Sequence, residues 1–363
     1  MGTIFDYLEW RGDLPFSADP FNEVDNLVLA ELAYMDFRGI VPADGREIPL
    51  QEAYETFFAG HSREEIAKNK SFTARAPLLM DGMVGGARFQ GTTLSHFIDE
   101  GGENLQLSAV TFHLADGTRY VAFRGTDGTV TGWKEDFDIT FKNETEGQRL
   151  AVGYLDGIAG KLRVGGHSKG GNLAVYAAAF CRDQEKILEV YSNDGPGFRE
   201  EITKREGFQR ILPKVRGIVP DSSVIGLLLS GDYERRVIRS SASGITQHDG
   251  FTWQVKRNRF EGAALSEASR VIDQTIGGWL GQMDDETRQS FAETIFSTIE
   301  STGKERFSSM NAEKLKTAES MIGAVLSLPK EKQQEGLKLI GQLGQSGGQA
   351  ILGYIADLIG RKK

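Results

Sequence analysis

Short β-rich runs and helical stretches alternate through the middle of the chain. Two runs, 105–114 and 119–124, are mostly apolar and β-branched, and the turn-forming sequence Ala115-Asp116-Gly117-Thr118 joins them, which predicts a hairpin. Three further buried strands are predicted, at 158–165, 189–192 and 215–219. Since helix-forming segments separate these later strands, we predict a mainly parallel α/β sheet flanked by helices.

Apolar residues at helical spacing lie on both sides of this region. Residues 22–35 predict a helix capped by Asn22 or Asp25, and two more helices at 49–58 and 62–68 should pack on the outside of the sheet. Beyond Val255 the pattern predicts helices without strands, at 263–279, 284–302, 312–328 and 335–359. We therefore divide the chain into a unit at 1–255, with an N-terminal helical region 1–104 and a core 105–255, and a helical C-terminal region 256–363.

The last of these helical segments allows two interpretations. Its apolar spacing is interrupted by glycines such as Gly344 and Gly348, each of which costs about 1 kcal/mol relative to alanine inside a helix. One interpretation is membrane-surface contact, with Arg361-Lys362-Lys363 as a basic anchor. The favoured interpretation is a helix or hairpin that packs on its own domain or on a partner.

Composition narrows the class of protein. The formal net charge of −9 argues against a nucleic-acid partner. The single cysteine, Cys181, excludes an internal disulfide and favours a reducing compartment, so we expect a cytoplasmic protein. The N-terminal sequence does not resemble a secretory signal, and no run of about 18 apolar residues predicts a transmembrane segment.

The sequence Gly166-His167-Ser168-Lys169-Gly170 matches the G-x-S-x-G pattern of a nucleophile elbow. In such an elbow a strand turns sharply into a helix and exposes the serine hydroxyl, while glycines allow the tight backbone. A predicted strand precedes the motif, and an alanine-rich helical segment, 172–181, follows it. We therefore predict that Ser168 is a nucleophile and that Gly166, His167 and Gly170 form the elbow.

A serine nucleophile needs a histidine base and a carboxylate that orients the base. The usual chain order on this scaffold is Ser, acid, His, which selects His248 because it is the only histidine after the elbow. There are two candidates for the acid, Asp221 and Asp194, and each follows a predicted strand. Asp221 is preferred, since Asp194-Gly195-Pro196-Gly197 is also typical of a structural turn.

An acyl-transfer site also needs two N–H donors for the oxyanion. The residue after the nucleophile, Lys169, is expected to supply one of them. The second is expected from Thr126, because Phe123-Arg124-Gly125-Thr126 ends an upstream strand in a small, glycine-led turn.

Together, Phe123-Arg124-Gly125-Thr126, Trp133, Asp136 and the Gly166–Gly171 motif resemble the class 3 lipases, the fungal lipase-like family of α/β-hydrolases. The resemblance covers about residues 105–255, and the whole layout is similar to a bacterial branch of that superfamily. It implies an α/β-hydrolase-type fold, a triad of Ser168, Asp221 and His248, and an oxyanion hole at Thr126 and Lys169. The chain departs from the family where Lys169 replaces an apolar residue and where 127–132, the lid region, is short and polar.

The predicted function is that of a serine hydrolase that cleaves carboxylic esters through an acyl-enzyme, without a metal or organic cofactor. Its substrate is expected to be a small-molecule ester or a lipid-derived compound. One alternative is a thioesterase or amidase on the same triad. Another is a non-catalytic hydrolase fold that serves as an interaction module, with the helical tail as its partner surface.

Overall fold

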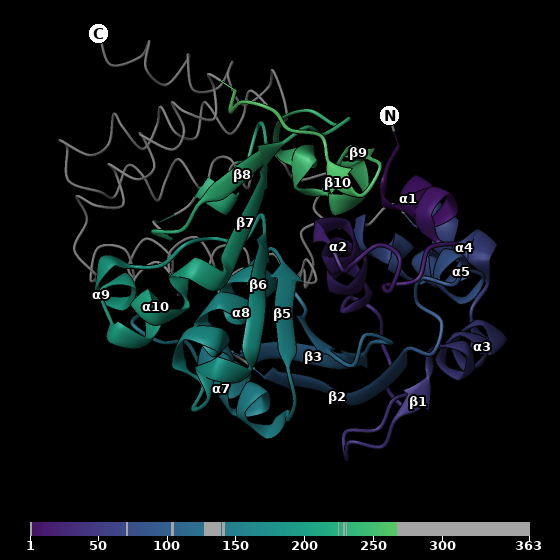
Figure 1. Ribbon diagram of the computed structural model, residues 1–363, viewed down its shortest axis with the longest axis horizontal. Coiled ribbons are helices and arrows are strands. Elements are labelled where there is room, and N and C mark those ends of the chain that lie inside the picture. The colour runs from purple at the N-terminus through teal and green to yellow at the C-terminus, as the bar shows by residue number, and fades with distance from the viewer. Residues whose placement is uncertain are drawn as a thin grey trace, which may run out of the picture.

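A sheet of eight strands forms the centre of the described structure (Figure 1). The computed structural model describes residues 2–69, 72–102, 105–126, 139, 142–223, 225–227, 229 and 231–266. The strands are β1 (Ile48–Pro49), β2 (Thr93–Gly102), β3 (Leu105–His113), β4 (Arg119–Phe123), β5 (Leu162–His167), β6 (Ile187–Asn193), β7 (Val215–Pro220) and β8 (Arg235–Ile238).

The strands lie in the sheet in the same order as in the chain. β1 to β4 pair antiparallel, and β4 to β8 pair parallel. In the β3–β4 hairpin Ala109 lies opposite Phe123, and in the β5–β6 pair His167 lies opposite Asn193. The predicted hairpin and the mainly parallel sheet are confirmed.

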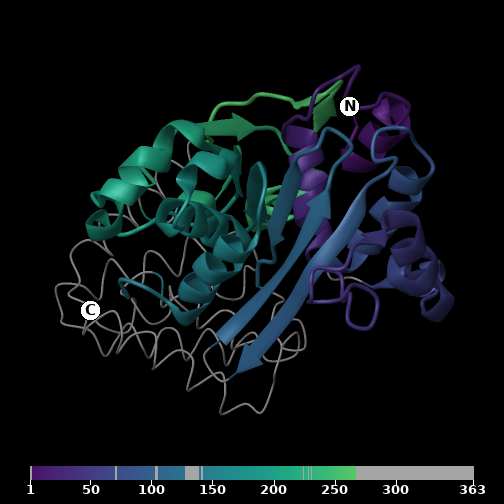
Figure 2. The same cartoon turned by 60° about the horizontal axis from the view of Figure 1, so that its bottom comes forward.

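The helices of the parallel half lie on one face of the sheet. They are α7 (Glu146–Gly157), α8 (Lys169–Phe180), α9 (Glu200–Thr203) and α10 (Glu206–Ile211). In this half each new parallel strand is added at the same edge of the sheet. Because the connections between parallel strands are right-handed, their helices must then all lie on the same face of the sheet. The views in Figure 1 and Figure 2 show these helices together on that face, which leaves the other face to be covered by a different part of the chain.

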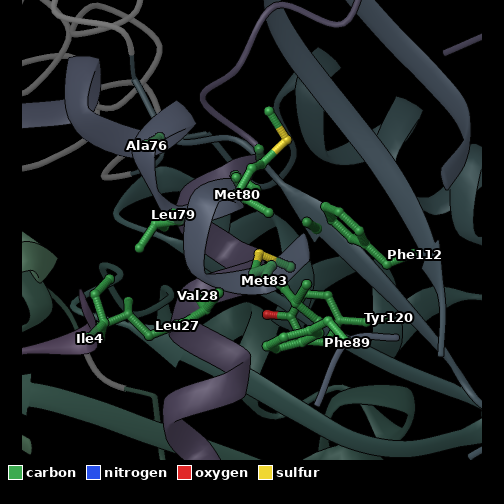
Figure 3. Close-up of a cluster of buried hydrophobic side chains, with 14 of the residues drawn as sticks. Ile4, Leu27, Val28, Ala76, Leu79, Met80, Met83, Phe89, Phe112 and Tyr120 are labelled. Atoms are coloured by element: carbon green, nitrogen blue, oxygen red, sulfur yellow. The ribbon is translucent and has the colours of Figure 1, made fainter. Parts of the chain in front are cut away.

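The N-terminal region covers the opposite face. It contains α1 (Ile4–Arg11), α2 (Glu23–Leu32), α3 (Leu50–Gly60), α4 (Arg63–Lys68) and α5 (Leu79–Val84). Alternation along β4 separates the two cores: Tyr120 and Ala122 pack with the N-terminal helices, whereas Val121 and Phe123 pack with α7 and α8. Figure 3 shows Tyr120 and Phe112 of the sheet beside side chains of these helices and of neighbouring segments.

A buried ion pair fixes the N-terminal segment to α2. The Arg88 guanidinium and the Asp25 carboxylate are both fully buried and lie 2.5 Å apart. The remaining Arg88 donors reach the main-chain oxygens of Leu14, Asp19 and Pro20, so all five N–H groups have acceptors. One buried cation therefore holds the irregular segment 13–20 in place.

Several elements agree with the sequence predictions and several were not predicted. The Asn22 side chain caps α2 by accepting hydrogen bonds from the N–H groups of Val24 and Asp25, and Ser62 caps α4. Among the elements that were not predicted are α1, α5, α7, α9, α10, β2 and β8. In β2 the pairing with β3 shifts register between Ser95 and Ile98, and His96 has a φ of 55°, so a bulge disrupts the alternation that marks a strand.

The proposed boundary near residue 256 falls within a short hairpin of β9 (Val255–Lys256) and β10 (Arg259–Phe260). β9 also bridges to Gly2 at the start of the chain. Of the predicted helices beyond this hairpin, only residues 263–266 are described, and these are not helical. The rest lie outside the described residues. Within the described part, no helix is long and apolar enough to cross a membrane.

Candidate active site

Ser168 occupies the turn between β5 and α8, as the elbow motif predicts. Its backbone has φ 58° and ψ −131°, a left-handed conformation that is costly for a residue with a side chain. Its N–H donates to the Asn193 carbonyl oxygen at 2.9 Å, which joins the turn to the end of β6. The strain is therefore held in place by the neighbouring strand.

At two positions of the motif, close contacts with the backbone leave no room for any residue but glycine. A Cβ atom at Gly166 would lie 2.3 Å from the carbonyl carbon of Gly170, and one at Gly170 would lie 2.1 Å from the carbonyl oxygen of Phe123. Neither contact is sterically possible. The end of β4 thus packs directly against the elbow.

His248 comes to this turn from the short 3₁₀ segment Gly244–His248. Its ring centroid lies 4.5 Å from that of His167, and its carbonyl oxygen lies 2.7 Å from His167 Nε2. Sequence order selected His248 from the histidines, and the structure brings it beside the elbow.

The acid that pairs with His248 is Asp194. His248 Nδ1 lies 2.6 Å from Asp194 Oδ2, and the Asp194 side chain is about 1% exposed. The other oxygen, Oδ1, accepts hydrogen bonds from Ser223 Oγ at 2.5 Å and from the Gly226 N–H at 3.1 Å. The carboxylate is thus oriented by three donors, one of which is the imidazole.

The prediction that Asp221 pairs with His248 is wrong. Asp221 lies in the turn after β7, two strands away from the elbow strand β5, whereas Asp194 follows β6, which is the immediate neighbour of β5. Asp194 has a φ of 48°, a left-handed conformation that aspartate tolerates better than most residues. The turn-like sequence at 194–197 is real, but it also carries the buried acid.

The predicted oxyanion donors lie at the ends of β4 and β5. Lys169 is the first residue of α8, where main-chain N–H groups have no acceptor within the helix. Thr126 is buried, and a Cβ at the preceding Gly125 would lie only 3.1 Å from Ser168 Cβ. Gly125 therefore lies beside the serine side chain, with Thr126 next to it in the chain, and Lys169 directly follows the serine.

The resemblance implies an apolar residue at position 169, and the packing of the Lys169 side chain explains how a lysine fits there. It is about 1% exposed, and its Nζ donates to the Gln106 carbonyl oxygen at 3.1 Å. The aliphatic stem packs in the interior while the ammonium group is bound at the start of β3.

A buried amide network supports the elbow from the N-terminal region. Asn193 Nδ2 donates to the Gly166 carbonyl oxygen at 3.1 Å, and Asn26 Nδ2 of α2 donates to Asn193 Oδ1 at 2.8 Å. Tyr120 donates in turn to Asn26 Oδ1 at 2.7 Å. Helix α2 is therefore part of the support of the site, which sequence patterns did not indicate.

Another residue of α2, Glu31, places a buried carboxyl under the His248 loop. Glu31 is fully buried and, among the described residues, neither of its oxygens has a hydrogen-bond partner. A Cβ at Gly250 would lie 2.4 Å from its Oε1. Burial, and then the nearby Asp249 carboxylate, raise the pKa of Glu31 well above its usual value, although Arg75 opposes the shift.

We expect the raised pKa of Glu31 to lower stability as pH rises. Below the unfolded pKa both states hold the proton; above it the unfolded state loses the proton while the folded state keeps it. The free energy of unfolding should then fall by about 1.4 kcal/mol per pH unit until the folded pKa is reached. Urea unfolding from pH 4.5 to 8 should show this loss in the wild type relative to Glu31→Gln. Parallel curves for the two proteins would contradict the assignment.

Some predicted features lie elsewhere or outside the described residues. Trp133, Asp136 and the segment 127–132 are not among the described residues. Cys181 is buried at the end of α8, where burial raises the pKa of its thiol to about 11, in keeping with a packing role. Within the described ranges, no group of three or more His, Cys, Asp or Glu side chains could hold a metal ion.

Comparison with known proteins identifies a family for this chain. A search of curated proteins found no match to this chain. The family model described as Mbeg1-like matches residues 83–297, which is more than half of the 363 residues and includes the elbow, Asp194 and His248. The chain belongs to the Mbeg1-like family, a lipase-like family.

Proposed function

We propose that this protein is a serine hydrolase that cleaves carboxylic esters through an acyl-enzyme. The observation that carries the proposal is the 2.6 Å hydrogen bond between His248 Nδ1 and the buried Asp194, beside a serine in a strained elbow. An acceptor at Nδ1 fixes the imidazole proton there, which leaves Nε2 free of a proton and able to act as a base.

In the proposed reaction, Ser168 Oγ attacks the ester carbonyl while His248 Nε2 takes the hydroxyl proton. Asp194 stabilises the imidazolium that forms. The main-chain N–H groups of Thr126 and Lys169 stabilise the oxyanion of the tetrahedral intermediate. His248 then protonates the leaving alcohol, and a water activated by the same imidazole releases the acid from the acyl-enzyme.

We propose that the chain is related to the class 3 lipases but differs from them in the position of its triad acid. The resemblance implied an acid after β7, whereas the acid proposed here follows β6. We further propose a small-molecule ester or lipid-derived compound as substrate and a cytoplasmic location, the latter because the single cysteine of the chain is a buried thiol.

Partitioning in aqueous methanol tests for the acyl-enzyme. Soluble esters that share one acyl group but have different leaving alcohols should all be hydrolysed and should give one common ratio of methyl ester to free acid. A common ratio is expected because water and methanol compete for the same intermediate. Failure to hydrolyse any ester, or a ratio that changes with the leaving group, would contradict the proposal.

A further inference from the structure

His167, the residue before the proposed nucleophile, is a buried imidazole that the proposed reaction does not use. It is 0% exposed, and both of its ring nitrogens lie within hydrogen-bond distance of groups from other segments. Nε2 lies 2.7 Å from the main-chain oxygen of His248, and Nδ1 lies 3.0 Å from the hydroxyl of Tyr34 in the turn after α2. Three distant parts of the chain therefore meet at this ring.

These partners determine which nitrogen of His167 carries the proton. A carbonyl oxygen only accepts, so the contact with His248 requires the proton on Nε2. Burial, together with the charge of a protonated His248, lowers the pKa of His167 to about 3, even though Asp194 opposes the shift. The ring is thus neutral near pH 7, Nδ1 is an acceptor, and the Tyr34 hydroxyl donates to it.

The contact acts on the main chain of the proposed base. Other bonds hold neighbours of His248: Trp253 Nε1 donates to the Gln247 carbonyl oxygen at 2.8 Å, and Arg75 pairs with Asp249 at 2.7 Å. The His167 bond joins the carbonyl of His248 itself to the end of β5. The strand that presents the serine is thereby linked to the loop that presents the base.

We propose that His167 is a positioning residue that holds the His248 main chain against the elbow, and that Tyr34 fixes the His167 tautomer. The inference rests on the proposed function. Among the described residues, the titratable groups that face His167 include His248, Asp194 and Tyr34, and the Trp253 ring also lies against it. A neutral ring suits this place, because a second cation beside His248 would disfavour the imidazolium that forms during acyl transfer.

The test compares His167→Leu with His167→Gln. Leucine removes the donor to the His248 carbonyl, whereas the glutamine amide nitrogen can occupy the place of Nε2 and donate to the same oxygen. We expect His167→Leu to lower kcat on a soluble ester by on the order of 10²-fold with little change in KM, since a small misplacement of a catalytic group can cost that much. His167→Gln should recover most of the loss.

Tyr34→Phe provides a second, independent readout. It should lower kcat in the wild type but have no further effect in the His167→Leu background, because the tyrosine acts only through the histidine. Additive losses in the two backgrounds would overturn the role of Tyr34. The pH profile of kcat/KM should keep its acid limb in His167→Gln, since His167 does not titrate in that range.

Labelling of each variant by a fluorophosphonate probe separates the possible failures. If the wild type is not labelled, the proposed function itself fails. If the wild type is labelled and His167→Leu matches it in kcat and KM, the positioning inference is overturned. If His167→Leu does not fold, as judged by circular dichroism, His167→Gln decides: near-wild-type kcat supports the inference, and a folded but inactive variant overturns it.

Discussion

Ser168→Ala should lower turnover of a soluble ester by on the order of 10⁵- to 10⁶-fold while leaving the fold intact. The triad acts as a unit, so loss of the nucleophile alone approaches the effect of losing all three members. The methyl group of alanine fits wherever the serine side chain fits, and the strained backbone is held by the Asn193 carbonyl in either case. Stability should therefore change little.

The measurement is kcat/KM on one nitrophenyl ester, with thermal unfolding as the check on the fold. His248→Ala should show a similar loss, because the serine then lacks its base. Ser241→Ala is a matched control, since Ser241 is an exposed serine on the loop after β8. Wild-type turnover by Ser168→Ala would show that another group performs the chemistry.

Asp194→Asn should lower turnover by about 10⁴-fold, whereas Asp221→Asn should have little effect. Two donors, Ser223 Oγ and the Gly226 N–H, bind Oδ1 of Asp194. They would retain the amide oxygen of asparagine and turn its NH₂ group toward His248 Nδ1. The imidazole proton would then move to Nε2, and the base could no longer accept the serine proton.

Both variants are isosteric with the wild type, so one assay with circular dichroism compares them directly. Asp221 serves as the matched control because it follows the next strand, β7, and has the same side chain. An inactive Asp221→Asn beside an active Asp194→Asn would mean that the hydrogen bond at His248 is not the one used in the reaction.

Local sequence predicted the elbow because its determinants are local. Strand, turn, glycines and helix all lie within 162–180, and the close contacts at Gly166 and Gly170 involve the motif itself and the end of β4. The β3–β4 hairpin was predictable for the same reason. His248 was predicted from chain order alone, without any knowledge of the loop that carries it.

The acid was mispredicted because its position depends on strand order, which is a tertiary property. Asp194 and Asp221 both follow buried strands, and the structure places Asp194, which follows β6 beside β5, against His248. The sequence does contain a run of polar residues at this strand end, Ser192-Asn193-Asp194, and the structure buries all three of them.

The contribution of α2 could not be predicted from its own pattern. The spacing of apolar residues indicates a helix, but it does not indicate that Asn26 bonds to Asn193 or that Tyr34 reaches His167, 133 residues away in the chain. These contacts form only because the one-sided crossovers leave a sheet face for the N-terminal region to cover.

Covalent labelling by a fluorophosphonate probe tests the central claim most directly. The probe reacts with a serine only when a base and an oxyanion site activate it. We predict one adduct per chain, located at Ser168 by peptide mass spectrometry, retained in Asp221→Asn and lost in Ser168→Ala. An unlabelled wild-type protein, or an adduct on any other residue, would contradict the account.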